Sequence, residues 1–249
     1  MNRIDNFALI IGSMKSGTTS LFEYLSQHPQ ISSCVHKEPN FYAFDRHWNK
    51  GFEWYLKLWQ DWDNQCHKIA LEASTNYTKK HLYPHTAERI KLIENKYKIK
   101  FKFIYLVRDP IQRIESHYTY SMTTNHSIGF KKFSEGIDED LIETSKYAQQ
   151  ISVFNQFFMN EQILILKFDD LKINPDKVMT QICQFLEIDS DYQFQSLNTV
   201  YNSSKARIID VPWWIRLKRI KLAKNVSTIL SSQQKKKLRL LVGGQKNKP

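Results

Sequence analysis

A short segment rich in glycine and hydroxyl residues, GSMKSGTT at 12–19, carries the residue types that bind phosphate. It follows an apolar run at 8–11 and precedes apolar residues at helical spacing, so the pattern predicts a strand, a turn and a helix. The first turn of a helix has free N–H groups and a positive dipole end. Lys15 adds a full charge, and Thr18 and Thr19 add hydroxyl donors. The segment therefore predicts an anion-binding loop.

A second segment, residues 101–120, also reads as an apolar strand followed by a turn and a helix. Arg108 stands where the strand should end, and open parallel sheets bind ligands at that edge. Pro110 suits the first helical turn, because its missing N–H would have no partner there. Ser116 comes eight residues after Arg108. We therefore expect Arg108 and Ser116 to bind one phosphate group.

The elements that must position these residues indicate an α/β fold. With 249 residues and 41% hydrophobic content, the chain can bury a sizeable core, most simply as a single domain. Buried strands and amphipathic helices alternate, which favours a doubly wound parallel sheet with a P-loop-like loop after its first strand. Further strands are predicted at 68–71 and 162–166, and helices at 84–98, 147–159 and 175–185.

The charge is concentrated at one end of the chain. Eleven of the 36 Lys and Arg residues lie in 211–249, which holds no Asp or Glu, and the remaining 25 balance the 25 acidic residues. We therefore divide the chain into a nucleotide-binding domain, 1–210, and a basic segment, 211–249, packed on it or extending it. A neutral 1–210 gives little support to nucleic-acid binding.

Other classes receive no support from the sequence. The longest apolar runs fall well short of the roughly eighteen residues that span a bilayer. The first strand begins too early to leave room for a signal peptide. Three widely spaced cysteines, Cys34, Cys66 and Cys183, indicate neither a disulfide framework nor a zinc site. The simplest expectation is a cytoplasmic protein without a bound metal.

The order of residues in the first loop resembles one particular family. A Walker A loop needs Lys directly after its second glycine, whereas here Thr18 holds that position and Lys15 precedes Gly17. The loop resembles the 5′-phosphosulfate loop of sulfotransferases that use 3′-phosphoadenosine 5′-phosphosulfate (PAPS). RDPIQRIESHY at 108–118 resembles the 3′-phosphate motif of the same family. The motifs most resemble those of the carbohydrate-sulfating branch of the family and its bacterial relatives, and KEPNFY at 37–42 and EASTNY at 72–77 support this similarity.

This resemblance implies a sulfotransferase that moves a sulfuryl group from PAPS to a hydroxyl or amine of a saccharide-type or other small acceptor. Lys15 would stabilise the leaving group, and Arg108 and Ser116 would bind the 3′-phosphate. Lys205 and Arg207, in a late basic loop, are further expected contacts. The residues implied to hold the donor are Lys15, Ser16, Gly17, Thr18, Thr19, Arg108, Ser116, Lys205 and Arg207.

Glu38 is the expected general base, because it matches the segment in which several polysaccharide sulfotransferases carry their catalytic Glu. Pro39 should hold Glu38 in an extended conformation. His36 is the alternative base, and His36, Lys37 and Glu72 are expected to contact the acceptor. Many polysaccharide O-sulfotransferases have Lys after the residue equivalent to Glu72. Here Ala73 follows, which argues against a heparan-like acceptor.

Other interpretations stay open at this point. The segment 213–224 has the pattern of a basic amphipathic helix that could lie on an anionic membrane or polyanion, cover the site, or pack on the core. The alternative functions are a P-loop kinase or NTPase, and a noncatalytic nucleotide-binding module whose basic tail binds a membrane or polyanion.

Overall fold

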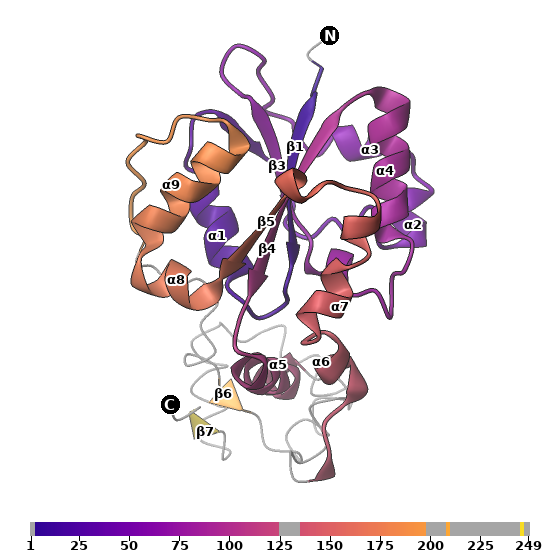
Figure 1. Cartoon of the computed structure of the whole chain (residues 1–249), viewed down its shortest axis with the longest axis vertical. Coiled ribbons are helices and arrows are strands. Elements are labelled where there is room, and N and C mark those ends of the chain that lie inside the picture. Colours follow the sequence, from indigo (N-terminus) through magenta and orange to yellow (C-terminus); the bar gives the residue numbers. More distant parts are fainter. Residues whose placement is uncertain (1–2, 125–134, 198–207, 210–244, 247–249) are drawn as a thin grey trace, which may run out of the picture. The chain divides into compact units, whose positions relative to one another are not determined.

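Figure 1 shows the structure, a computed structural model that describes residues 3–124, 135–197, 208–209 and 245–246. The chain forms two compact units, one made of residues 1–113 and 143–201 and the other of 114–142 and 202–249. The first unit contains the whole parallel sheet. The sequence-based division at residue 210 stays a prediction.

The first unit is built on a five-stranded parallel sheet of order β2-β3-β1-β4-β5. The central strand β1 is buried from Phe7 to Gly12, as its continuous apolar run predicts for a strand covered on both faces. The predicted doubly wound fold is therefore confirmed. The strands are β1 (Asn6–Gly12), β2 (Ile31–Ser33), β3 (Ile69–Ala73), β4 (Lys100–Val107) and β5 (Ile163–Lys167).

Helices cover both faces of this sheet (Figure 1). One face carries α1 (Thr18–Leu25), α8 (Phe168–Ile173) and α9 (Pro175–Leu186). The other carries α2 (Asp45–Trp48), α3 (Phe52–Leu56), α4 (Thr86–Tyr97) and α7 (Tyr147–Ile151). Short 3-10 helices lie at Thr75–Thr78, Phe154–Gln156 and Asn160–Gln162.

The core beneath α3 is largely aromatic. The Phe7 ring stacks on Phe101 with 5.3 Å between centroids and meets the edge of Trp59 at the same separation. Tyr55 stacks on Phe41 at 4.6 Å. Large rings with few rotatable bonds fix the spacing between α3 and the sheet. This packing matters for the site, because Tyr55 also reaches a buried carboxylate at the end of β3.

Several elements differ from the sequence-based expectation. The helix predicted over 147–159 ends at Ile151, where the Ser152 hydroxyl donates to the Gln149 carbonyl and competes with the helical pattern. Phe154 and Phe158 then pack on Phe103, at 5.1 and 4.5 Å between ring centroids. The apolar side chains after Ile151 therefore reach the core without a continuous helix. The short elements β2, α2, α3 and α8 were not predicted.

The described part of the second unit contains most of α5 (Pro110–Thr124), the beginning of α6 (Glu139–Glu143) and a two-stranded antiparallel ribbon. The ribbon pairs β6 (Ile208–Ile209) with β7 (Gln245–Lys246). Helix α5 begins in the first unit, directly after β4.

Candidate active site

The predicted anion-binding loop lies between β1 and α1, where the backbone turns sharply. Gly17 adopts φ 86° at the N-cap of α1, and a Cβ there would lie 2.7 Å from the Phe168 ring. Only glycine fits this combination of conformation and close packing. No side chain caps the first turn of α1. The turn therefore presents its N–H groups in the arrangement that binds anions.

Hydrogen bonds inside the loop hold its shape. The Ser13 and Ser16 hydroxyls lie 2.6 Å apart, and the Ser16 N–H donates to the Ser13 carbonyl at 3.2 Å. Ser16 is fully buried, whereas Lys15, with φ 71°, is half-buried. The Ser16 hydroxyl therefore serves the loop in this structure, and its predicted contact with a donor remains a prediction. Thr18 is buried and Thr19 half-buried in the first turn of α1.

Arg108 follows β4 and reaches the loop across 93 residues of sequence. Its Nη1 donates to the Lys15 carbonyl at 3.3 Å, and its Nη2 to Gln112 Oε1 at the same distance. The guanidinium carbon lies 4.9 Å from the centre of the Phe168 ring. The Nε atom is buried and has no hydrogen-bond partner among the described residues. A buried donor without a partner is expensive in free energy, so this atom fits a site that receives an anionic oxygen.

A second arginine, to which the sequence analysis gave no role, supports the same loop from inside. Arg113 is fully buried; its Nε donates to Ser145 Oγ at 2.6 Å, and its Nη1 lies 3.5 Å from the Met14 carbonyl. The match of Arg113 to the RDPxxR pattern was the one feature of the sequence that could have identified it. The Asp109 carboxylate accepts the Gln112 N–H at 2.8 Å and so caps α5.

Other expected donor contacts are not placed against this loop. Ser116 lies on α5 in the second unit, so its contact with the donor remains a prediction. Lys205, Arg207 and the segment 213–224 lie outside the described residues.

The expected base, Glu38, lies in a loop with an unexpected backbone. Its φ is 61°, so the prediction that Pro39 keeps it extended is wrong. Tertiary hydrogen bonds account for the difference: the Glu38 N–H donates to the Ala73 carbonyl at 2.8 Å, and the Asn40 N–H donates to Ser74 Oγ at 3.0 Å. Positive φ at a residue other than glycine costs about 1–3 kcal/mol unless its surroundings enforce it.

The Glu38 carboxylate is partly accessible, with 37% of its side chain exposed. Its Oε1 accepts the Lys37 ammonium at 3.0 Å and the Thr75 hydroxyl at 3.4 Å. His36 is exposed, and its carbonyl accepts the Cys34 thiol at 3.1 Å. Lys37 and Glu38 therefore form a pair at the surface, from which a carboxylate oxygen can meet a ligand.

Glu72, expected to contact the acceptor, is fully buried at the end of β3. Its Oε1 accepts the Ser74 hydroxyl at 2.6 Å, and its Oε2 accepts the Tyr55 hydroxyl. Burial raises its pKa to about 7, although hydrogen bonds from Ser74, Tyr55 and Tyr77 oppose that shift. Because internal hydroxyls occupy this carboxylate, the geometry gives no support to direct contact with an acceptor.

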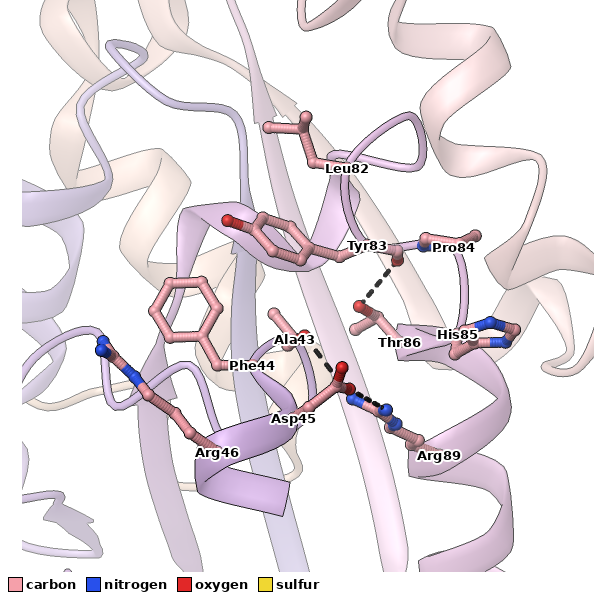
Figure 2. A pocket seen from close by; sticks show the side chains of 10 residues that line it. All are labelled: Ala43, Phe44, Asp45, Arg46, Leu82, Tyr83, Pro84, His85, Thr86 and Arg89. Carbon is pink, nitrogen blue, oxygen red and sulfur yellow. Dashed lines mark hydrogen bonds and ion pairs between the residues drawn. The ribbon is translucent and has the colours of Figure 1, made fainter. Parts of the chain in front are cut away.

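A surface pocket of about 430 Å³ lies between the segment after the Glu38 loop and the start of α4 (Figure 2). The Phe44 and Tyr83 rings lie 5.3 Å apart at one side, and the Arg46 guanidinium lies 5.2 Å from the Phe44 ring centre. At the other side Arg89 pairs with Asp45. The pocket is lined by Ala43, Phe44, Asp45, Arg46, Leu82, Tyr83, Pro84, His85, Thr86 and Arg89.

Several other features bear on the site's chemistry. Within the described ranges, the structure brings together no group of three or more His, Cys, Asp or Glu side chains that could hold a metal ion. Of the helices in those ranges, none is long and apolar enough to cross a membrane. The three cysteines are unpaired; Cys34 and Cys183 are buried and Cys66 is exposed.

Comparison with known proteins places this chain in a family. The sequence matches the family described as "Sulfotransferase domain" over residues 5–210. It is 30% identical over 189 residues to human heparan sulfate glucosamine 3-O-sulfotransferase 3B1, covering 72% of this chain and 45% of that protein. It is 36% identical over 121 residues to the membrane-associated sulfotransferase kil1 of Dictyostelium discoideum, covering 48% of this chain and 23% of that protein. The chain thus spans less than half the length of these curated relatives.

The fold is also found in solved structures. A sulfotransferase from Alicyclobacillus acidocaldarius matches with a TM-score of 0.65 and 23% identity, covering 82% of this chain and 89% of that one. The sulfotransferase domain of an olefin synthase from Synechococcus PCC 7002 matches with a TM-score of 0.52 and 21% identity, covering 82% and 79%. These two matches confirm the α/β fold. The family match over 5–210 establishes that this chain belongs to the sulfotransferase family.

Proposed function

We propose that this protein transfers a sulfuryl group from PAPS to a hydroxyl or amine of a saccharide-type acceptor. The proposal is supported by family membership and, within the structure, by one observation above others. Arg108 lies against the Lys15 loop with a buried Nε that lacks a partner among the described residues. An anionic oxygen would satisfy that donor, and the neighbouring first turn of α1 offers N–H groups to a second anionic group.

The donor's two phosphate positions fit the two segments. Lys15, Ser16, Gly17, Thr18 and Thr19 would hold the 5′-phosphosulfate, and Arg108 the 3′-phosphate. Ser116, Lys205 and Arg207 are proposed as further contacts. PAPS supplies the sulfuryl group and a phosphate leaving group. Arg108 would set donor specificity, because a 3′-phosphate distinguishes PAPS from ATP.

The chain's own groups can carry the remaining chemistry. The Lys15 ammonium would stabilise the negative charge that develops on the departing oxygen, and the N–H groups of α1 would add to it. Glu38 Oε1 would accept the proton of the acceptor hydroxyl or amine. The Lys37 ammonium and the Thr75 hydroxyl hold that oxygen in place, which limits the carboxylate to a few orientations. His36 remains the alternative base.

The saccharide part of the proposal draws on the pocket in Figure 2. Its lining begins at Ala43, five residues after Glu38 in the sequence, and it would offer a surface to an acceptor larger than one ring. The Phe44 and Tyr83 rings offer apolar faces to the C–H side of a sugar ring. Arg46 offers a cation to a carboxylate or sulfate substituent. The cytoplasmic location and a contact of 211–249 with a membrane or polyanion stay predictions.

Calorimetric titration with 3′-phosphoadenosine 5′-phosphate (PAP), beside AMP, ADP and ATP with Mg²⁺, tests the donor site. We expect binding of PAP that does not depend on metal and is much tighter than binding of AMP, because AMP lacks the 3′-phosphate. A preference for ATP with Mg²⁺ would favour a kinase or NTPase. Absence of any nucleotide binding would contradict the proposal.

An acceptor screen with labelled PAPS then tests the reaction. Neutral, carboxylated and sulfated oligosaccharides, with simple phenols and amines as comparison acceptors, separate the acceptor classes. Transfer to oligosaccharides is the expected result. Transfer only to phenols would retain the sulfotransferase activity and contradict the saccharide acceptor.

A further inference from the structure

Glu72 is a fully buried titratable group for which the proposed reaction has no direct use. It stands at the end of β3, next to Ala73, whose carbonyl holds the Glu38 N–H. Its carboxylate accepts hydroxyl donors from two other segments of the chain, Tyr55 on α3 and Ser74 just beyond β3. The Tyr77 hydroxyl is a third hydrogen-bond partner. A buried carboxylate with several donors fixes the direction in which each of those hydroxyls points.

Ser74 connects this carboxylate to the Glu38 loop. Its hydroxyl has one hydrogen, which is donated to Glu72 Oε1 at 2.6 Å. Its oxygen lone pairs are thereby left as acceptors, and one of them receives the Asn40 N–H at 3.0 Å. The orientation of the Ser74 hydroxyl, and so its bond to the loop, depends on an acceptor at the position of Glu72 Oε1.

The segment after Glu72 holds the loop at several further points. The Ala73 carbonyl accepts the Glu38 N–H at 2.8 Å, and the Thr75 hydroxyl donates to Glu38 Oε1 at 3.4 Å. Asn40 has φ 51° and Glu38 φ 61°, so the loop contains two residues in a conformation that they rarely adopt. Such a loop keeps its shape only while these contacts persist.

We propose that Glu72 is a positioning residue for Glu38, acting in its ionised form through Ser74 and the Asn40 N–H to hold the Glu38 loop in its strained, productive shape. This inference rests on the proposed function only for its effect on rate; the coupling between Glu72 and the loop can be measured without turnover. It replaces the expectation that Glu72 contacts the acceptor.

The surroundings of Glu72 make this coupling sensitive to pH. Burial raises the Glu72 pKa to about 7, and the negative charge of Glu38 acts in the same direction, so the carboxylate changes charge near neutrality. Protonation turns one of its oxygens into a donor, and the hydroxyls that donate to the carboxylate then compete for fewer acceptor positions. The titratable groups that face it are Cys34, Glu38, Tyr42, Tyr55 and Tyr77.

Hydrogen exchange of full-length Glu72→Gln and Ser74→Ala, followed by mass spectrometry on peptides covering 36–44, tests the coupling. Both variants should exchange the Glu38 and Asn40 amides on the order of tenfold faster than the wild type. Ser74→Ala removes the acceptor of the Asn40 N–H, and Glu72→Gln leaves one acceptor oxygen where Ser74 and Tyr55 now each have their own. Ser32→Ala is the matched control: Ser32 is a buried serine on β2, and this variant should exchange like the wild type.

Rate measurements with PAPS and the acceptor found by screening test the consequence. Both variants should lose roughly 10- to 100-fold in kcat through the misplaced base, while PAP affinity stays close to wild type. In the wild type kcat should rise as pH passes about 7, and Glu72→Gln should lack that step. If Glu72 acted only in folding, the kcat of Glu72→Gln would depend on pH in the same way as that of the wild type.

Wild-type exchange over 36–44 in both variants would overturn the proposal, as would a loss of PAP binding that accompanies the loss of rate. Retention of the step near pH 7 in Glu72→Gln would overturn it too. If the wild type transfers no sulfuryl group to any acceptor, the proposed function fails, yet the exchange comparison still decides whether Glu72 holds the loop.

Discussion

The two sides of the site are held in place by different means. On the proposed donor side the backbone turns at Gly17, and Arg108 reaches the loop from the end of the neighbouring strand. On the proposed acceptor side, the Glu38 loop has positive φ at non-glycine residues and depends on bonds to a buried carboxylate and its neighbours. Permanent charges and local backbone geometry define the first side. A titratable network from separate segments defines the second.

This difference has a functional consequence. Arginine stays charged at any pH at which the protein is folded, so Arg108 contributes the same charge throughout. Glu72 changes its charge near neutrality, because burial raises its pKa to about 7. We therefore expect donor binding to vary little with pH around neutrality, whereas the rate of transfer should vary. Four predictions test this contrast, in order of decreasing expected effect.

Glu38→Gln should reduce kcat by about 10²–10⁴-fold, because an amide cannot accept the acceptor's proton. PAP affinity should stay at the wild-type value, since the donor side is built from other segments. Steady-state kinetics and calorimetry measure the two quantities. Glu53→Gln, at an exposed position on α3, makes the same charge change and should be active. Full activity of Glu38→Gln with loss in His36→Ala would identify His36 as the base.

Lys15→Ala should lower kcat by about 10²–10³-fold, because the charge that stabilises the departing oxygen is removed. Lys177→Ala removes the same charge from an exposed position on α9 and should have little effect. Single-turnover rates at saturating PAPS isolate the chemical step. Turnover like the wild type in Lys15→Ala would contradict the assignment of the donor loop.

Glu72→Gln should change how stability depends on pH. The Glu72 pKa is raised from 4.5 to about 7 on folding, so between these values the native state binds more protons than the unfolded state. Wild-type stability therefore falls as pH rises through this window, by up to about 3 kcal/mol from this one group. Glu72→Gln lacks that loss, so its free energy of unfolding should rise relative to that of the wild type by a similar amount as pH rises.

Urea unfolding of both proteins at about pH 5 and about pH 8 measures this effect, because other titrating groups cancel in the difference. If the stability difference between the two proteins were the same at both pH values, Glu72 would not titrate in this range. A more stable but slower Glu72→Gln would show that the buried charge is retained for activity and not for stability.

Arg108→Ala should weaken PAP binding by about 10- to 100-fold, the effect of losing charge-assisted hydrogen bonds to one phosphate. The affinity for AMP, which has no 3′-phosphate, should change far less. Arg3→Ala, at an exposed ion pair near the start of β1, is the control for charge. Equal losses of affinity for PAP and for AMP would place Arg108 at the 5′-phosphate and weaken the argument for PAPS.

The fold, and the two segments that form the proposed donor side, could be identified from the sequence because their signals are local. An apolar run, a glycine turn and a helix start identify the loop within residues 7–25, and Arg108 stands at the end of another such strand. Parallel strands bring their carboxyl ends to one edge, so two distant segments meet without any long-range signal in the sequence. The Arg108–Lys15 hydrogen bond is the result.

The backbone of the Glu38 loop could not be predicted in the same way. The local preference of a residue before proline gave the wrong backbone for Glu38, because its bonds to Ala73 and Asn40's bond to Ser74 outweigh that preference. The role of Arg113 was missed for a similar reason, since its partners Met14 and Ser145 lie 99 and 32 residues away.

The sequence by itself determined the family, four strands of the parallel sheet and the loop after the first of them, because each rests on short-range patterns of residue type and spacing. Only the tertiary structure decided that Glu72 is enclosed, that Tyr55 and Ser74 bind it, and that Glu38 depends on the same segment. Burial and hydrogen-bond partners come from segments distant in sequence, and these set the charge state of a carboxylate.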